Sequence, residues 1–154
     1  MKYVDTAITF SEVPDEVSLC ISISGCPNHC PDCHSKYLWE DTGETLTEIV
    51  LDNLINKYVN GITCVCFMGG DSDPWFVAGM AKHIKDCHQG MKTAWYSGKD
   101  EFPECSLEYF DYVKIGRFDK DYGPIDKSTT NQRMYKRIDG EFVDITEKFW
   151  RKNV

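Results

Sequence analysis

Three of the eight cysteines lie close together in the stretch SGCPNHCPDCHS, residues 24–35, at positions 26, 30 and 33. The spacing C-x3-C-x2-C lets one short loop present three thiolates, which are soft ligands suited to iron–sulfur clusters. Three thiolates on a cluster of four irons leave one iron open, much as a catalytic zinc keeps one vacant position. We therefore expect Cys26, Cys30 and Cys33 to hold a 4Fe-4S cluster whose open iron binds a small chelating ligand.

Two other uses of these thiols are open. A zinc site of three cysteines and one histidine could recruit His29 or His34, which lie inside or beside the loop. Such sites usually show a second pair of closely spaced ligands, and the sequence has none. Reactive thiol chemistry without a metal is the other alternative, and we favour the cluster over both.

Composition indicates one globular domain over residues 1–154, with 42% hydrophobic residues, no repeat and no low-complexity tract. The net charge of -8 disfavours binding to nucleic acid, whose phosphates must be neutralised by Lys and Arg. The first residues, MKYVDTAITFSEV, lack the apolar core of a signal peptide, and no apolar run approaches the ~18 residues of a membrane span. We expect a cytoplasmic protein with no membrane partner.

The remaining five cysteines are not expected to form a disulfide framework in that compartment. Cys20, Cys64 and Cys66 lie in apolar runs and are predicted to be buried as small hydrophobic residues. Cys87 and Cys105 are predicted at loops or helix ends, with no assigned role.

Hydrophobic patterning predicts strands over 16–25, 63–70, 92–98 and 112–116, helices over 46–61 and 73–87, and a short helical turn over 106–111. Asp73 stands near the N-cap of the second helix and Pro74 at its first position. Alternating strands and helices indicate parallel strands joined by right-handed crossovers. Ligands bind at the carboxyl ends of such strands, where this sequence places glycines 25, 69, 70, 98 and 116.

The tail over residues 132–150 breaks this alternation and predicts a hairpin around Asp139 and Gly140, followed by a short C-terminal piece. About four parallel strands are too few for a closed eightfold barrel. The predicted fold class is therefore α/β, a partial, open (β/α) barrel of parallel strands with a short C-terminal hairpin.

The motif GCPNHCPDC after the first predicted strand, with MGGDSDP after the second, resembles the radical S-adenosylmethionine enzymes. Within that superfamily the sequence is most similar to the anaerobic ribonucleoside-triphosphate reductase activating proteins. Their hallmark triplet matches Cys26, Cys30 and Cys33, and Trp39 follows the last cysteine by six residues, as in that group. The resemblance runs over nearly the whole chain.

Three further motifs carry the resemblance. The Gly-Gly-acid-Pro stretch of the activating proteins matches Gly69, Gly70, Asp71 and Pro74, their Thr-Gly at the third strand end is Ser97-Gly98, and their Asn-Gln-Arg is found at 131–133.

The sequence departs from the family's pattern in two places. Ser72 and Asp73 stand between the first acid and the proline, so either Asp71 or Asp73 takes the acidic role. Asp32 and His34 flank the third cysteine, where the superfamily often has aromatic residues.

The resemblance implies that S-adenosylmethionine chelates the open iron through its amino and carboxylate groups. Gly69 and Gly70 would leave room for this ligand, and Asp71 or Asp73 would bind its amino group or ribose hydroxyls. Ser97 would touch the ligand as well. Asp73 has the alternative role of capping its helix.

The implied reaction begins when flavodoxin or ferredoxin reduces the cluster, which then cleaves S-adenosylmethionine to give a 5′-deoxyadenosyl radical. That radical would install a glycyl radical on the large catalytic subunit of anaerobic ribonucleotide reductase. Two alternatives remain: an activase of another glycyl-radical enzyme such as formate lyase, and a small zinc-binding interaction module.

Overall fold

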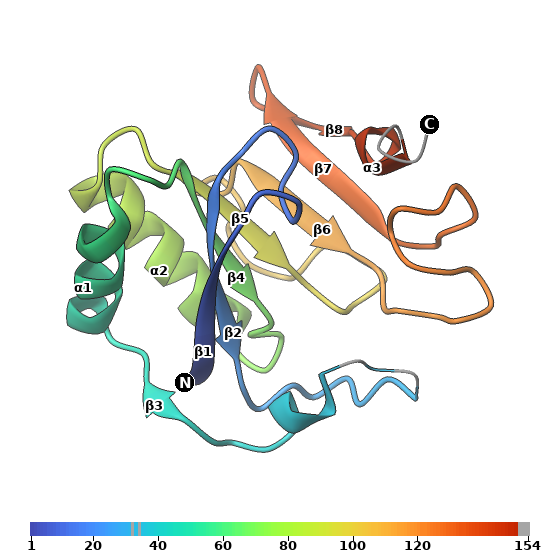
Figure 1. The fold of residues 1–154 in the computed structure, drawn as a ribbon, viewed down its shortest axis with the longest axis horizontal. Helices are drawn as coiled ribbons and strands as arrows, with labels where there is room; N and C mark the ends of the chain where they lie inside the picture. The colour runs from blue at the N-terminus through green and yellow to red at the C-terminus, as the bar shows by residue number, and fades with distance from the viewer. Residues whose placement is uncertain (32, 34, 151–154) are drawn as a thin grey trace.

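The computed structural model describes residues 1–31, 33 and 35–150. These residues form an eight-stranded sheet in the order β3-β1-β2-β4-β5-β6-β7-β8 (Figure 1). The strands are β1 Lys2–Thr9, β2 Ser18–Ile23, β3 Glu44–Thr45, β4 Cys64–Met68, β5 Lys92–Tyr96, β6 Tyr112–Ile115, β7 Arg133–Ile138 and β8 Glu141–Asp144. The helices are α1 Glu48–Tyr58, α2 Pro74–Cys87 and α3 Glu147–Trp150, with a 3-10 helix at Lys36–Leu38.

The four central strands, β2, β4, β5 and β6, run parallel in that order, which confirms the parallel core predicted from the sequence. Helices α1 and α2 lie next to each other on one face of this core (Figure 1). Apolar side chains from both helices and from alternate strand positions form one buried cluster there, which includes Leu51, Ile84 and Phe67. Burial of this helix face stabilises the sheet edge where the strands end.

The opposite face of the sheet carries a second, smaller core that packs α3. Cys20, Cys64 and Cys66 all lie in it, each with at most 3% of its surface exposed, beside Met134 and Phe149. The prediction that these three cysteines are buried as small hydrophobic residues is confirmed. Free cysteine suits this place because its side chain is small and apolar.

The sheet as a whole is mixed, so the prediction of parallel strands is correct only for its centre, and the predicted open barrel is not confirmed. Strand β1 pairs antiparallel with β2 and β3, and β7 pairs antiparallel with β6 and β8. Antiparallel strands therefore flank the parallel core on both sides. The sequence analysis missed β1 because its side chains are partly or fully exposed and show no clean alternation of apolar and polar residues.

Turns and helix caps were predicted from the sequence more accurately than the strand order of the sheet. The hairpin between β7 and β8 turns at Asp139 and Gly140, which both have positive φ, as a two-residue hairpin turn of this type requires. Asp73 caps α2 by accepting a hydrogen bond from the Phe76 amide, and Pro74 opens the helix. The predicted helical turn over 106–111 is a single turn, closed by the Phe110 amide and the Leu107 carbonyl, and not a helix.

Within the described residues, no helix combines the length and the apolar character that crossing a membrane requires.

Candidate functional site

The loop that carries the three cysteines leaves the carboxyl end of β2 and returns on itself. Gly25 donates its amide to the Glu40 carbonyl, and the Cys26 amide donates to the Leu38 carbonyl at 2.9 Å. A tighter turn within the loop joins the Cys33 amide to the Cys30 carbonyl. These bonds hold the loop's two ends together, so that one short segment presents all three thiols.

The three thiols line one cavity of about 450 Å³ at the carboxyl edge of the parallel strands. Its wall also contains Glu12, Ile23, Asn28, Ser35, Leu38, Met68, Gly69, Asp71, Tyr96, Ser97, Gly98, Lys114, Gly116, Arg117, Phe118, Pro124, Ile125 and Gln132. Of the predicted site residues, Gly69, Asp71 and Ser97 therefore lie with the cysteines. Gly70 and Asp73 do not line this cavity.

Hydrogen-bond donors approach two of the thiol sulfurs. The Ser35 amide lies 3.3 Å from Cys33 Sγ, and Asn28 Nδ2 lies 3.8 Å from Cys26 Sγ. Donors of this kind orient metal-bound thiolates and tune the potential of an iron–sulfur cluster. Burial raises the pKa of Cys30, and the neighbouring Cys33 and Cys26 raise it further, although Arg117 opposes them. The negative charges of neighbouring thiolates repel one another, and a bound cationic group would relieve this repulsion.

Within the part of the chain that the structure describes, the three cysteines do not form the most compact group of possible metal ligands. Among the described residues, one group of three side chains brings its ligand atoms within 4.8 Å of one another, and the three cysteines do not form it. His29, one of the two histidines considered for a zinc site, is exposed and stacks on Trp39 with ring centroids 4.5 Å apart. His34 and Asp32, on which the other expectations for this loop fall, lie outside the described residues.

Asp71 is one of two acidic residues in the cavity wall, beside Glu12, and only 5% of its surface is exposed. Its Oδ1 accepts a hydrogen bond from Ser97 Oγ at 2.7 Å. Its Oδ2 accepts one from the Gly98 amide at 2.8 Å and another from Asn28 Nδ2 at 2.7 Å. One carboxylate thus joins the end of β4, the end of β5 and the cysteine loop.

Gly98 lies against the cysteine loop, where a side chain would displace the Asn28 amide. A Cβ atom there would lie 2.8 Å from Asn28 Nδ2, closer than non-bonded atoms tolerate. The Ser-Gly pair at the third strand end therefore has a local reason in the approach of the cysteine loop.

The two glycines after β4 have different surroundings. Gly69 has a φ of +107° and faces the cavity, and its carbonyl accepts a hydrogen bond from Trp95 Nε1 at 2.8 Å. Gly70 has a φ of +96°, and a Cβ there would lie 2.4 Å from Val77 Cγ2 of α2. The second glycine is thus required by the packing of α2 against the strand end.

Gln132, from the Asn-Gln-Arg motif, lies in the cavity wall and donates from Nε2 to the Gly116 carbonyl at 3.3 Å. The sequence analysis missed two other polar side chains there, Asn28, which holds Asp71, and Lys114. Lys114 is 8% exposed and donates from Nζ to the Gly116 carbonyl at 2.9 Å. Burial lowers the pKa of Lys114 to about 8, even though Asp71 and Cys30 act to raise it. A lysine between valine and isoleucine in a predicted buried strand was the available signal for this residue.

A three-cysteine loop above the carboxyl edge of parallel strands, with donors directed at its thiols, defines an iron–sulfur protein of the α/β class. The family model for the 4Fe-4S single cluster domain matches residues 16–134, which include the loop, the parallel core and the start of β7. The chain belongs to this family. Comparison with curated proteins gave no match, and comparison with solved structures gave none either.

Proposed function

We propose that this chain is a radical S-adenosylmethionine enzyme that installs a glycyl radical on the large catalytic subunit of anaerobic ribonucleotide reductase. The observation that carries the proposal is the cavity in which Cys26, Cys30 and Cys33 lie with Gly69 and Ser97. Three thiols, and not four, leave one iron of a four-iron cluster without a protein ligand. That open position separates this function from simple electron transfer.

The cavity has the size and the polarity that a ligand such as S-adenosylmethionine needs. Its volume of about 450 Å³ falls within the range of roughly 300–1,000 Å³ typical of small-molecule sites. Ile23, Leu38, Met68 and Ile125 give it apolar walls, which exclude water from the site. When bound, the reduced cluster supplies the electron that cleaves the ligand's carbon–sulfur bond.

Lys114 and Arg117 supply positive charge to a wall that otherwise holds three thiols and the carboxylates of Glu12 and Asp71. We assign them to the carboxylate of the ligand and to the negative charge of the thiolate-bound cluster, because opposite charges attract strongly in a buried site. Lys114 is held in place by the Gly116 carbonyl and lies 5.4 Å from the ring centroid of Tyr96.

We assign Asp71 a positioning role. Both of its oxygens already accept hydrogen bonds from this chain, so its carboxylate fixes Asn28 and the strand ends relative to one another. The Gly69 backbone and Ser97 remain the groups that we assign to direct contact with the ligand. Asp73, which is exposed and caps α2, has no part in the site.

The segment between β6 and β7 is the part of the wall that we assign to the protein substrate. It contributes Phe118, Pro124 and Ile125 to the cavity, and its Tyr122 is 53% exposed. A glycine of a large partner has to reach the ligand, and loops at a sheet edge are the usual carriers of such contacts. Flavodoxin or ferredoxin is the proposed electron donor.

The first test is anaerobic reconstitution with iron and sulfide, followed by electron paramagnetic resonance of the reduced protein with and without S-adenosylmethionine. We expect a four-iron signal that changes when the ligand is added. Protein that binds zinc but no iron, or a cluster signal that the ligand leaves unchanged, would overturn the proposal.

The second test identifies the protein substrate. The loaded chain, reduced flavodoxin and S-adenosylmethionine are incubated with the reductase large subunit or, separately, with formate lyase. We expect the glycyl radical signal on the reductase alone. A signal on formate lyase alone would keep the radical chemistry and refute the assigned partner.

A further inference from the structure

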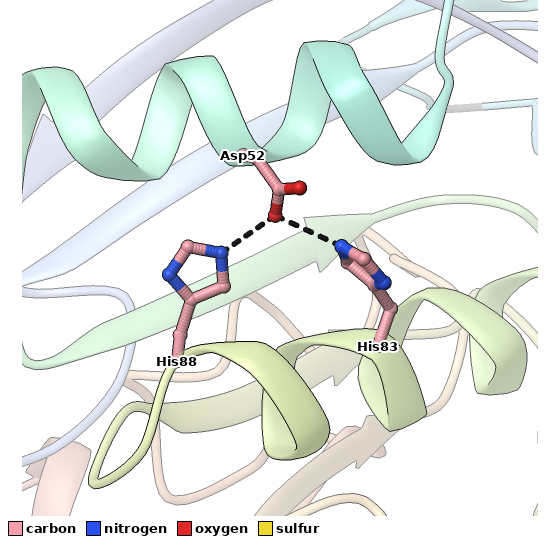
Figure 2. Close-up of side chains that lie close together, drawn as sticks. All are labelled: Asp52, His83 and His88. Carbon is pink, nitrogen blue, oxygen red and sulfur yellow. Dashed lines mark hydrogen bonds and ion pairs between the residues drawn. The ribbon is translucent and has the colours of Figure 1, made fainter.

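Two of the four histidines of the chain converge on one carboxylate (Figure 2). His83 Nε2 lies 2.9 Å and His88 Nε2 lies 2.6 Å from the same oxygen, Oδ1 of Asp52. Asp52 comes from α1, His83 from the last turns of α2, and His88 from the C-cap of α2. The group thus joins the two helices that cover one face of the sheet.

These side chains are sheltered but reachable. The side chains of His83, His88 and Asp52 are 15%, 12% and 32% exposed. One ligand atom from each lies within 4.8 Å of the other two, which is the compactness that a single metal ion requires. A neutral imidazole offers one nitrogen as a metal ligand, so the group provides two nitrogens and one oxygen.

A second carboxylate lies on the far side of one ring. Glu48 Oε2 is 3.5 Å from Nδ1 of His83, the nitrogen that faces away from Asp52. Histidines that bind metal commonly donate their other ring N–H to a carboxylate, which fixes the tautomer with the first nitrogen free. Glu48 stands where such an outer partner of a metal-bound His83 would stand.

We propose that Asp52, His83 and His88 bind a divalent transition-metal ion of the zinc type, with water in the fourth position. Two imidazoles and one carboxylate are a ligand set that zinc accepts in sites with one open position. The ion would tie α1 to α2. It is separate from the cluster site, because α2 starts shortly after the end of β4, whereas His83 lies in its last turns and His88 at its C-cap, and neither lines the cavity.

The alternative is a hydrogen-bond fork in which both rings donate Nε2–H to Asp52. The two arrangements differ in the position of a proton on each ring. The fork needs it on Nε2, whereas metal binding at Nε2 moves it to Nδ1, from which His83 can donate to Glu48. Nitrogen NMR of the histidine side chains separates the two directly.

The test uses the full chain with its iron–sulfur loop loaded, so that the three loop thiols are not available to zinc; Cys87 and Cys105 remain free thiols. After one equivalent of Zn²⁺ and removal of the excess, we expect about one zinc per chain, as one site predicts. X-ray absorption should show nitrogen and oxygen neighbours at about 2.0–2.1 Å and no sulfur near about 2.3 Å. Sulfur neighbours, or histidine protons that stay on Nε2, would overturn the proposal.

Variants then locate the ion. His88→Gln and Asp52→Asn should each weaken zinc binding by more than about 100-fold, and Glu48→Gln by roughly 10–100-fold, the range found for outer partners. Asp86→Asn is the matched control for Asp52→Asn, because it removes the same charge at a residue of α2 that pairs with Lys82. Zinc binding that His88→Gln and Asp52→Asn leave intact would place the ion elsewhere and refute the site. If a variant fails to fold, the absorption and NMR results on the natural chain still decide. Neither outcome bears on the cluster or on its chemistry.

Discussion

Replacement of Asp71 by Asn tests which acidic residue of the GGDSDP stretch organises the site. The Asp71 carboxylate is buried and accepts three hydrogen bonds, all between 2.7 and 2.8 Å. An amide of the same shape keeps one oxygen for Gly98 and Asn28 and can donate to the Ser97 hydroxyl. What the variant loses is therefore the charge, and with it the extra strength of three charge-assisted bonds.

The magnitude follows from the difference between the two kinds of bond. Hydrogen bonds to charged groups contribute about 1.5–3 kcal/mol each, against roughly 1 kcal/mol for neutral ones. Three such differences amount to roughly 2–4 kcal/mol of unfolding free energy, or about 5–15 °C in Tm for a domain of this size. We expect iron loading to fall as well, because Asn28 belongs to the cysteine loop.

The matched variant is Asp73→Asn, two residues along the chain. Asp73 is exposed and caps α2, and Asn is as good a cap as Asp, so the expected change is below about 0.5 kcal/mol. Urea unfolding of the cluster-free chain under anaerobic conditions measures both values, and iron analysis measures loading. A neutral Asp71→Asn, or equal losses in the two variants, would refute the positioning role.

Three further outcomes are expected. Cys30→Ser should abolish cluster loading, measured as iron and sulfide per chain, while Cys105→Ser, outside the cysteine loop, should load fully. Gly70→Ala should destabilise the fold by roughly 2–4 kcal/mol in a urea titration, because its φ is positive and the added methyl would lie 2.4 Å from a valine of α2. Gly61→Ala is the control: its methyl would have no neighbour closer than 3.7 Å, so its effect should be near neutral. Burial lowers the pKa of Lys114 from its ordinary 10.5 to about 8. Between these two pH values the unfolded chain binds more protons than the folded chain, so the free energy of unfolding rises with pH. Relative to Lys114→Met, the natural chain should therefore gain up to roughly 3 kcal/mol of unfolding free energy from pH 8 to 10.5. If the difference in unfolding free energy between the natural chain and Lys114→Met stays the same across that pH range, Lys114 does not carry a buried charge.

The parallel core could be predicted because each of its strands is an apolar run that ends in glycine. Burial on both faces makes these runs continuously hydrophobic, as in the segment around Cys64 and Cys66, and such runs need no partner information to be recognised. The antiparallel edges could not be predicted in the same way. Strand β1 is partly exposed, and its place beside β2 depends on long-range pairing of Lys2–Thr9 with Ser18–Ile23, which local patterns do not encode.

The same distinction between local patterns and long-range contacts holds for the residues of the site. Spacing alone pointed to the three cysteines, since a short loop confines its own ligands. The sequence already indicated that Asp73 caps α2 ahead of Pro74, but the hydrogen bonds that Asp71 accepts from Ser97, Gly98 and Asn28 became visible only in the structure. Asn28 and Lys114 both interact with Asp71, which is more than 40 residues away from each of them in the sequence. Their roles therefore depend on the fold and could not be predicted from local sequence.

The junction at Asp71 has a consequence for how the cluster site is built. Two strand ends and the cysteine loop share one carboxylate, so the loop is anchored at Asn28, two residues from Cys26, before any metal arrives. A loop fixed at one end and closed on itself through the Cys26 amide loses less conformational entropy when its thiols bind iron. The same carboxylate adds negative charge beside three thiolates, which alone would repel the approach of an anionic ligand. Lys114, which is buried, and Arg117, which is exposed at the rim of the cavity wall, offset that charge.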